Sequence, residues 1–225
     1  LDGLPLAIEL AATWGASLGL DAVLQAPELV RGGLSAALAG AWEQLGPKQC
    51  AAQLSAFNGA FTLHQAQAIV GDDASFLDAL CALVEQHWVS RLPHSARYCM
   101  LRPIRDFVRD TCVESYQGAQ RRHHEILAKL VDHPVNERIA RSRIVPVDEL
   151  VAAALDADDD LAGPIGLIAL QQLKAQGPPG VGAELGDALH ARNVRLSGGQ
   201  HVQFTRFWSS CLVEVGRDDD AVALL

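Results

Sequence analysis

The sequence lacks the motif of nucleotide hydrolysis, the apolar runs of membrane spans and the cysteine pairs of disulfide frameworks. No stretch reads G-x-x-x-x-G-K-[ST], so the chain has neither the backbone cradle nor the lysine that bind nucleotide phosphates. No apolar run approaches the roughly 20 residues of a membrane span. The five cysteines include no C-x-x-C pair, which favours reduced thiols. We therefore expect no catalytic residues, no membrane contact and a cytoplasmic location.

Aromatic residues are scarce, at 5% of the chain, whereas 49% of the residues are hydrophobic. Alanine and leucine dominate, and this composition favours helices over sheets. The net charge of −9 argues against a chain that binds nucleic acid along its whole length. The charge is uneven, because 91–143 holds eleven Lys and Arg against six Asp and Glu.

The middle of the chain has the pattern of a winged helix. Gly46-Pro47 ends a stretch of apolar residues at helical spacing, and Thr62 with Gln65 forms a capping box that begins another helix. The same pattern recurs at Ser75 and Asp78, so we expect Ser75 to be an N-cap. We expect helices at 34–45, 48–57, 62–71 and 75–87, strands at 88–92 and 98–101, and a further helix from Pro103.

Helical patterns separated by short breakers fill the C-terminal half. We expect helices at 147–155, 161–175, 181–194 and 201–215. Successive helices with short loops are typical of an α-solenoid or a tetratricopeptide-like array, although no clean 34-residue consensus is present. The predicted fold is therefore mainly α, with one small β-hairpin in the winged helix and a helical array behind it.

The first residues, LDGLPLAIELAA, form a turn that leads into an apolar helix. Pro5 suits the first helical position because its missing N–H would have no partner there. From Leu4 to Trp14 the only charge is Glu9, so we expect this helix to be buried. Burial needs a partner, and we expect that partner to be a domain that precedes Leu1.

This stretch resembles the GLPL motif of the STAND nucleoside triphosphatases, the NB-ARC-like signalling switches, and most of all the bacterial transcriptional-regulator type. The resemblance continues in order through 54–61, 83–89 and 98–107, which are similar to three conserved stretches of the family's winged helix. Arg121-Arg122-His123 matches a basic stretch that often starts the family's next helix. The resemblance implies three parts: 1–33 as the end of the helical domain, 34–117 as the winged helix, and 118–225 as a linker and the start of sensor repeats.

The resemblance also implies a nucleotide-binding role for one part of the chain. It places Pro5 against the base of ADP or ATP, with Gly3, Leu4 and Leu6 shaping the turn, and the intact protein would bind the nucleotide with Mg²⁺. The family's phosphate-sensing histidine, in a Met-His-Asp motif, is missing here, because Leu101 and Arg102 follow Met100. A phosphate-sensing role would pass to Arg102 or Arg105. The implied function is regulatory: the chain supplies the adenine-side lid and couples it to the sensor repeats. The implied partners of the chain are the absent nucleotide-binding domain and a protein signal that binds the repeats.

Two other functions remain open at this point. A winged helix in a basic zone also fits a DNA-binding transcription factor with a helical effector domain. Such a factor reads DNA through the third helix of its winged helix. Here that helix is 75–87, which contains no Lys or Arg. The second alternative is a helical scaffold for protein interactions.

The sequence gives little support for a metal site or for a catalytic cysteine. Adjacent residues on a helix diverge by about 100°, so His123 and His124 are poorly placed to chelate one ion, and we expect no metal site. Cys81 and Cys112 lie on apolar helix faces without a neighbouring His–acid pair, and we expect both in the core.

Overall fold

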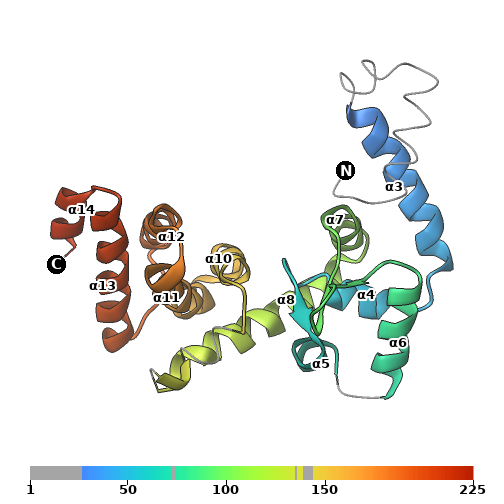
Figure 1. Cartoon of the computed structure of the whole chain (residues 1–225), viewed down its shortest axis with the longest axis horizontal. Coiled ribbons are helices and arrows are strands. Elements are labelled where there is room, and N and C mark those ends of the chain that lie inside the picture. The colour runs from blue at the N-terminus through green and yellow to red at the C-terminus, as the bar shows by residue number, and fades with distance from the viewer. Residues whose placement is uncertain (1–26, 72–73, 135, 139–143, 225) are drawn as a thin grey trace. The chain divides into compact units, whose positions relative to one another are not determined.

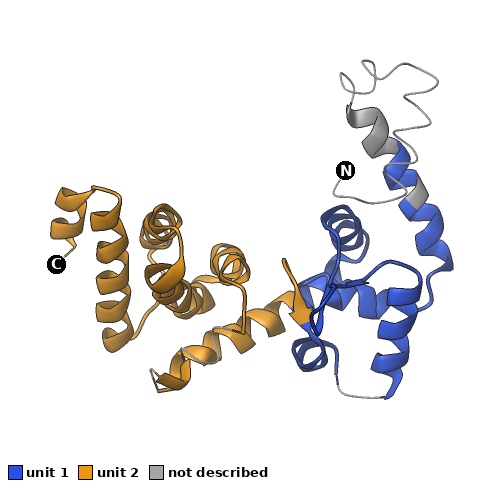
Figure 2. Cartoon of the chain, viewed as in Figure 1, with its two compact units in different colours: residues 1–56, 62–119 blue, residues 57–61, 120–225 orange. Residues whose placement is uncertain are grey.

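The computed structural model describes residues 27–71, 74–134, 136–138 and 144–224. This part of the chain is mainly helical with one small three-stranded sheet, which confirms the predicted fold class (Figure 1). The chain forms two compact units, which we describe separately (Figure 2). Unit 1 comprises the described residues within 27–56 and 62–119, and unit 2 comprises those within 57–61 and 120–224.

Unit 1 has the order of elements expected of a winged helix. Its elements are α3 (Pro27–Gln44), α4 (Lys48–Leu54), β1 (Phe61–Thr62), α5 (Leu63–Val70), α6 (Ala74–Glu85), β2 (Ser90–Arg91), β3 (Arg97–Cys99) and α7 (Arg102–Thr111). The sheet order is β1-β3-β2, and the hairpin pairs Ser90 with Cys99 and Arg91 with Tyr98 in antiparallel register. The hairpin is shorter than the predicted strands but lies between the predicted helices.

Local signals in unit 1 explain most of its boundaries. Thr62 and Gln65 form the predicted capping box, with hydrogen bonds of 3.2 and 2.8 Å between each side chain and the other residue's backbone N–H. Gly71 ends α5 at φ +122°, a conformation that favours glycine. The prediction of Ser75 as an N-cap is wrong, because α6 already begins at Ala74 and Ser75 lies inside the helix.

The core of unit 1 combines aromatic and aliphatic side chains from helices and hairpin. The ring of Trp42 lies 5.4 Å from that of Trp88 and 6.1 Å from that of Phe107, within the range of favourable aromatic pairs. Leu83 of α6 and Val108 of α7 are fully buried. The apolar stripes of these helices therefore hold the winged-helix elements together.

Unit 2 is a run of helices that begins within α8. Its elements are the second half of α8 (Val113–Ala128), the 3-10 helix η1 (Lys129–Asp132), α10 (Val147–Asp156), α11 (Asp159–Gln176), α12 (Pro179–Ala191), α13 (Gly198–Glu214) and α14 (Asp218–Ala223). The predicted helices match α10 to α13 within a few residues. One prediction from the family resemblance is wrong: Arg121-Arg122 lies inside α8, which begins at Val113, and does not start a helix.

Glycines bring the helices of unit 2 close together. A Cβ at Gly186 of α12 would overlap the indole of Trp208 on α13, and one at Gly166 of α11 would overlap Leu189. From α10 to α14, each helix packs against the next one in the chain, as in a helical array. Their buried side chains form one apolar core. Among the described residues, every helix is too short or too polar to cross a membrane.

Candidate functional site

The residues of the GLPL stretch lie outside the described part of the chain. Gly3, Leu4, Pro5 and Leu6 all precede Pro27, where the description begins. Their role against a nucleotide base stays a prediction from the family resemblance.

Arg102 and Arg105 lie in the first turn of α7 and share one carboxylate. The Arg102 side chain is 77% exposed, and its Nε lies 3.5 Å from Oδ2 of Asp106. The Arg105 side chain is 13% exposed, with Nε 3.9 Å from the other oxygen of Asp106. A phosphate group beside Arg102 or Arg105 would compete with Asp106 for these guanidinium groups.

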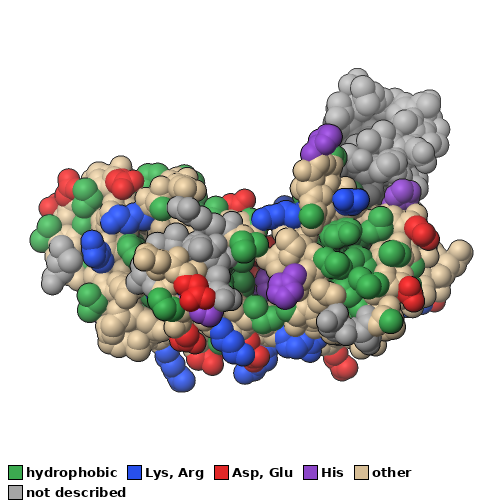
Figure 3. Space-filling view, turned by 60° about the horizontal axis from the view of Figure 1, so that its bottom comes forward, with side chains coloured by type: hydrophobic (Ala, Val, Ile, Leu, Met, Phe, Trp, Pro, Cys, Tyr) green, Lys and Arg blue, Asp and Glu red, His purple; other side chains and the backbone are tan. Residues whose placement is uncertain are grey.

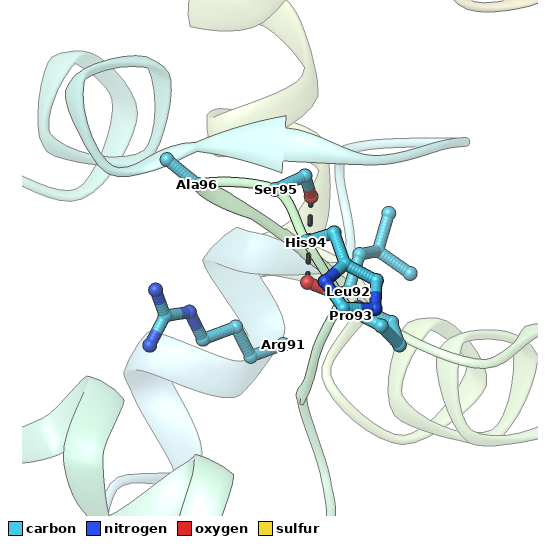
Figure 4. A pocket seen from close by; sticks show the side chains of 6 residues that line it. All are labelled: Arg91, Leu92, Pro93, His94, Ser95 and Ala96. Carbon is cyan, nitrogen blue, oxygen red and sulfur yellow. Dashed lines mark hydrogen bonds between the residues drawn. The ribbon is translucent and has the colours of Figure 1, made fainter.

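The wing, the loop 92–96 between β2 and β3, holds a shallow polar pocket. Its lining residues are Arg91, Leu92, Pro93, His94, Ser95 and Ala96 (Figure 4). The Ser95 hydroxyl donates to the Leu92 carbonyl at 3.4 Å, and His94 takes a left-handed φ of +56° at the tip. Figure 4 shows the Arg91 guanidinium extending away from the His94 ring. The side chains of Arg91 and His94 therefore do not converge on one point.

The third helix of the winged helix, α6, presents an apolar and acidic face. Leu77 is 45% exposed, and Asp78, Cys81 and Glu85 are exposed on the same helix. The prediction that Cys81 is a core residue is wrong, since Leu80 and Leu83 form the buried stripe and Cys81 falls outside it. Figure 3 shows hydrophobic and acidic side chains close together on the visible face of unit 1. Carboxylates on this helix would repel DNA phosphates.

A buried carboxylate in unit 2 binds a loop that follows α4 in the sequence. Glu149 lies in the first turn of α10 and its side chain is 3% exposed. Its Oε2 accepts hydrogen bonds from the backbone N–H of Asn58 at 2.8 Å and of Gly59 at 2.7 Å. Charge-assisted hydrogen bonds of this length are among the stronger ones in proteins. Glu149 therefore anchors segment 57–61 to α10.

An imidazole lies beside this carboxylate and packs in turn against two stacked phenyl rings. Nδ1 of His123, on α8, lies 3.6 Å from Oε1 of Glu149, and the His123 side chain is buried. The His123 ring packs against Phe57 with centroids 4.7 Å apart, and Phe57 stacks on Phe61 at 4.6 Å. We call Glu149, His123 and segment 57–61 the Glu149 anchor. Because both ionisable groups are enclosed by protein, the arrangement suits positioning a loop and does not suit binding a substrate.

Comparisons of the chain with protein-family models, curated proteins and solved structures found no match.

The neighbouring histidine, His124, is also buried, but in a different environment. Burial lowers the pKa of His124, while the carboxylates of Asp156 and Asp158 oppose this effect. No prediction from the sequence placed either histidine in the core, where both lie. A signal was present, because His123 precedes the buried Leu127 by four residues and shares its helix face.

Proposed function

We propose that the chain is the regulatory, non-catalytic part of a nucleotide-switched signalling regulator of the STAND type. In this proposal the winged helix is a protein-docking domain, and the helical array of unit 2 receives a protein signal. The order of elements in unit 1 and the helical run of unit 2 support it, together with the motif resemblance between residues 1 and 131.

The Glu149 anchor is the observation that carries the proposal. Segment 57–61 lies in the sequence between α4 and α5 of the winged helix, yet it packs as part of unit 2. Glu149 binds two consecutive N–H groups of this segment and belongs to α10, a helix of the array. A shift of α10 would therefore pull on a loop between two winged-helix elements. Such a link is what a module that passes a signal along the chain requires.

The nucleotide would be held by residues at two places in the sequence. Gly3, Leu4, Pro5 and Leu6 would contact the base, and Arg102 or Arg105 would lie near a phosphate. A bound ADP or ATP with Mg²⁺ would supply the energetic difference between resting and active states. The phosphate cradle itself belongs to the nucleotide-binding domain that we propose as the partner of this chain.

DNA recognition is the competing function, and the wing is the feature that favours it. Arg91 and His94 are exposed on the wing, as in a fold that contacts a DNA backbone there. The acidic face of α6 weighs against it, because the third helix would meet the phosphates of the major groove.

Two titrations of the 225-residue chain test the proposal. We expect a fluorescent ADP analogue to bind the chain weakly or not at all, and to bind tightly when the nucleotide-binding domain is present. We expect fluorescein-labelled duplex DNA in low-salt buffer to show no sequence-selective binding. Tight, salt-sensitive and sequence-selective binding of duplex DNA would overturn the proposal in favour of a transcription factor.

A further inference from the structure

A buried arginine in unit 2 is surrounded by neutral acceptors. Arg138 is 4% exposed. Its Nε donates to Oε1 of Gln171 at 3.0 Å, its Nη2 to Oε1 of Gln203 at 2.9 Å, and its Nη1 to the Val131 carbonyl at 3.5 Å. Gln171 belongs to α11 and Gln203 to α13, so the guanidinium bridges two helices of the array.

The described hydrogen-bond acceptors of Arg138 carry no negative charge. Buried charges in proteins are normally paired with an opposite charge, because removal from water is costly. Within the described residues, the acceptors around Arg138 are two amide oxygens and one carbonyl. A guanidinium has five N–H donors, and these three bonds leave donor capacity for an anion. Burial lowers the pKa of Arg138.

The same side of α11 and α13 carries further positive charge one helical turn along. Lys174 follows Gln171 on α11, and its Nζ lies 5.7 Å from the ring centroid of Phe207 on α13. Arg206, three residues after Gln203, is exposed, as is Lys174. Lys174 and Arg206 are thus exposed cations about one helical turn beyond Gln171 and Gln203, the two amides that bind Arg138, and the set also includes the Phe207 ring. We call this set the α11–α13 surface.

We propose that the α11–α13 surface binds an acidic peptide segment of a partner protein, with a carboxylate of that segment completing the environment of Arg138. Charge complementarity identifies the partner as acidic, because the surface carries the guanidinium of Arg138 and the exposed cations Lys174 and Arg206. The Phe207 ring offers an apolar contact for the side-chain stems of the peptide. The inference rests on the proposed function, in which the helical array receives a protein signal, and it names the chemistry of that signal.

A fluorescence-anisotropy titration with a fluorescein-labelled hexaglutamate peptide tests the inference on the full 225-residue chain. We expect saturable binding in low-salt buffer. Arg138→Gln should weaken it about tenfold, the effect of losing one good charge-assisted contact. The double variant K174Q/R206Q changes only exposed side chains, so it keeps the test decisive if Arg138→Gln does not fold. It should weaken binding by a similar factor.

The control is Lys48→Gln, which removes one positive charge from unit 1, as Arg138→Gln does from unit 2. It should leave the affinity for the peptide unchanged. Wild-type affinity in the folded K174Q/R206Q variant would overturn the inference, as would an equal loss in Lys48→Gln. Displacement of the peptide by inorganic phosphate at equal concentration would also overturn it, because the ligand would then be a phosphate anion. None of these titrations contains nucleotide or DNA, so their failure is distinguishable from failure of the proposed function.

Discussion

Replacing Glu149 by alanine removes the acceptor of two backbone hydrogen bonds and empties a buried polar site. Each bond to a charged acceptor contributes about 1.5–3 kcal/mol net. Removing the carboxylate also removes its own desolvation cost, which offsets part of the loss. Because the N–H groups of Asn58 and Gly59 are only partly buried, water can replace some of what is lost. We therefore expect a net destabilisation of about 3 kcal/mol.

Thermal unfolding followed by circular dichroism measures this change. For a chain of this size, about 3 kcal/mol corresponds to a decrease of about 6–12 °C in the midpoint. Glu149→Gln keeps one acceptor oxygen and the shape of the side chain, so its decrease should be about half as large. Glu125→Ala is the matched control: Glu125 is a partly exposed glutamate on α8 that pairs with Arg121, and its loss should cost less than about 0.5 kcal/mol.

Amide hydrogen exchange separates a local effect from a global one. If Glu149 anchors segment 57–61, the amides of Asn58 and Gly59 should exchange much faster in both Glu149 variants under native conditions. A Glu149→Ala variant that melts with the wild type, and whose Asn58 and Gly59 amides exchange at the wild-type rate, would refute the anchor. An effect of Glu125→Ala equal to that of Glu149→Ala would refute it as well.

Two further predictions concern packing and thiol chemistry. Gly186→Ala should destabilise the chain by about 1–3 kcal/mol, because the new Cβ overlaps the indole of Trp208, whereas Gly180→Ala on the same helix meets open space and should be neutral or stabilise by up to about 1 kcal/mol; urea unfolding measures both. Burial raises the pKa of the Cys50 thiol to about 11, so at pH 9 alkylation followed by mass spectrometry should modify exposed Cys81 much faster. The folded state holds Cys50 protonated, so its contribution to stability is complete below pH 9 and decreases as the pH rises towards 11.

The fold could be predicted from sequence where the signals were local. The capping box at Thr62 and the helical patterns of α10 to α13 depend on residues within a few positions of one another. The sequence was less precise about where a helix begins. The helix predicted at 201–215 begins three residues earlier, at Gly198, with Ser197 as its N-cap, and the Ser197 N–H donates to Oε1 of Gln200 at 3.0 Å.

The candidate site could not be predicted in the same way, because its contacts are distant in sequence. Glu149 and Gly59 are 90 residues apart, and Arg138 and Gln203 are 65 apart. A single sequence shows that Glu149 lies in an amphipathic helix, but not which loop supplies its donors. For Cys81 the sequence pattern was misleading. Cys81 lies among apolar residues and was predicted to be in the core, but the buried stripe of α6 runs through Leu80 and Leu83 and leaves Cys81 exposed.

The most direct test of the central claim, that the chain works as part of a nucleotide-switched regulator, is the reading frame upstream of the codon for Leu1. We expect this frame to encode a P-loop domain with a G-x-x-x-x-G-K-[ST] motif, and the encoded protein to bind ADP. An upstream frame that is open but encodes no P-loop domain, or a start codon directly before Leu1, would contradict the proposed function.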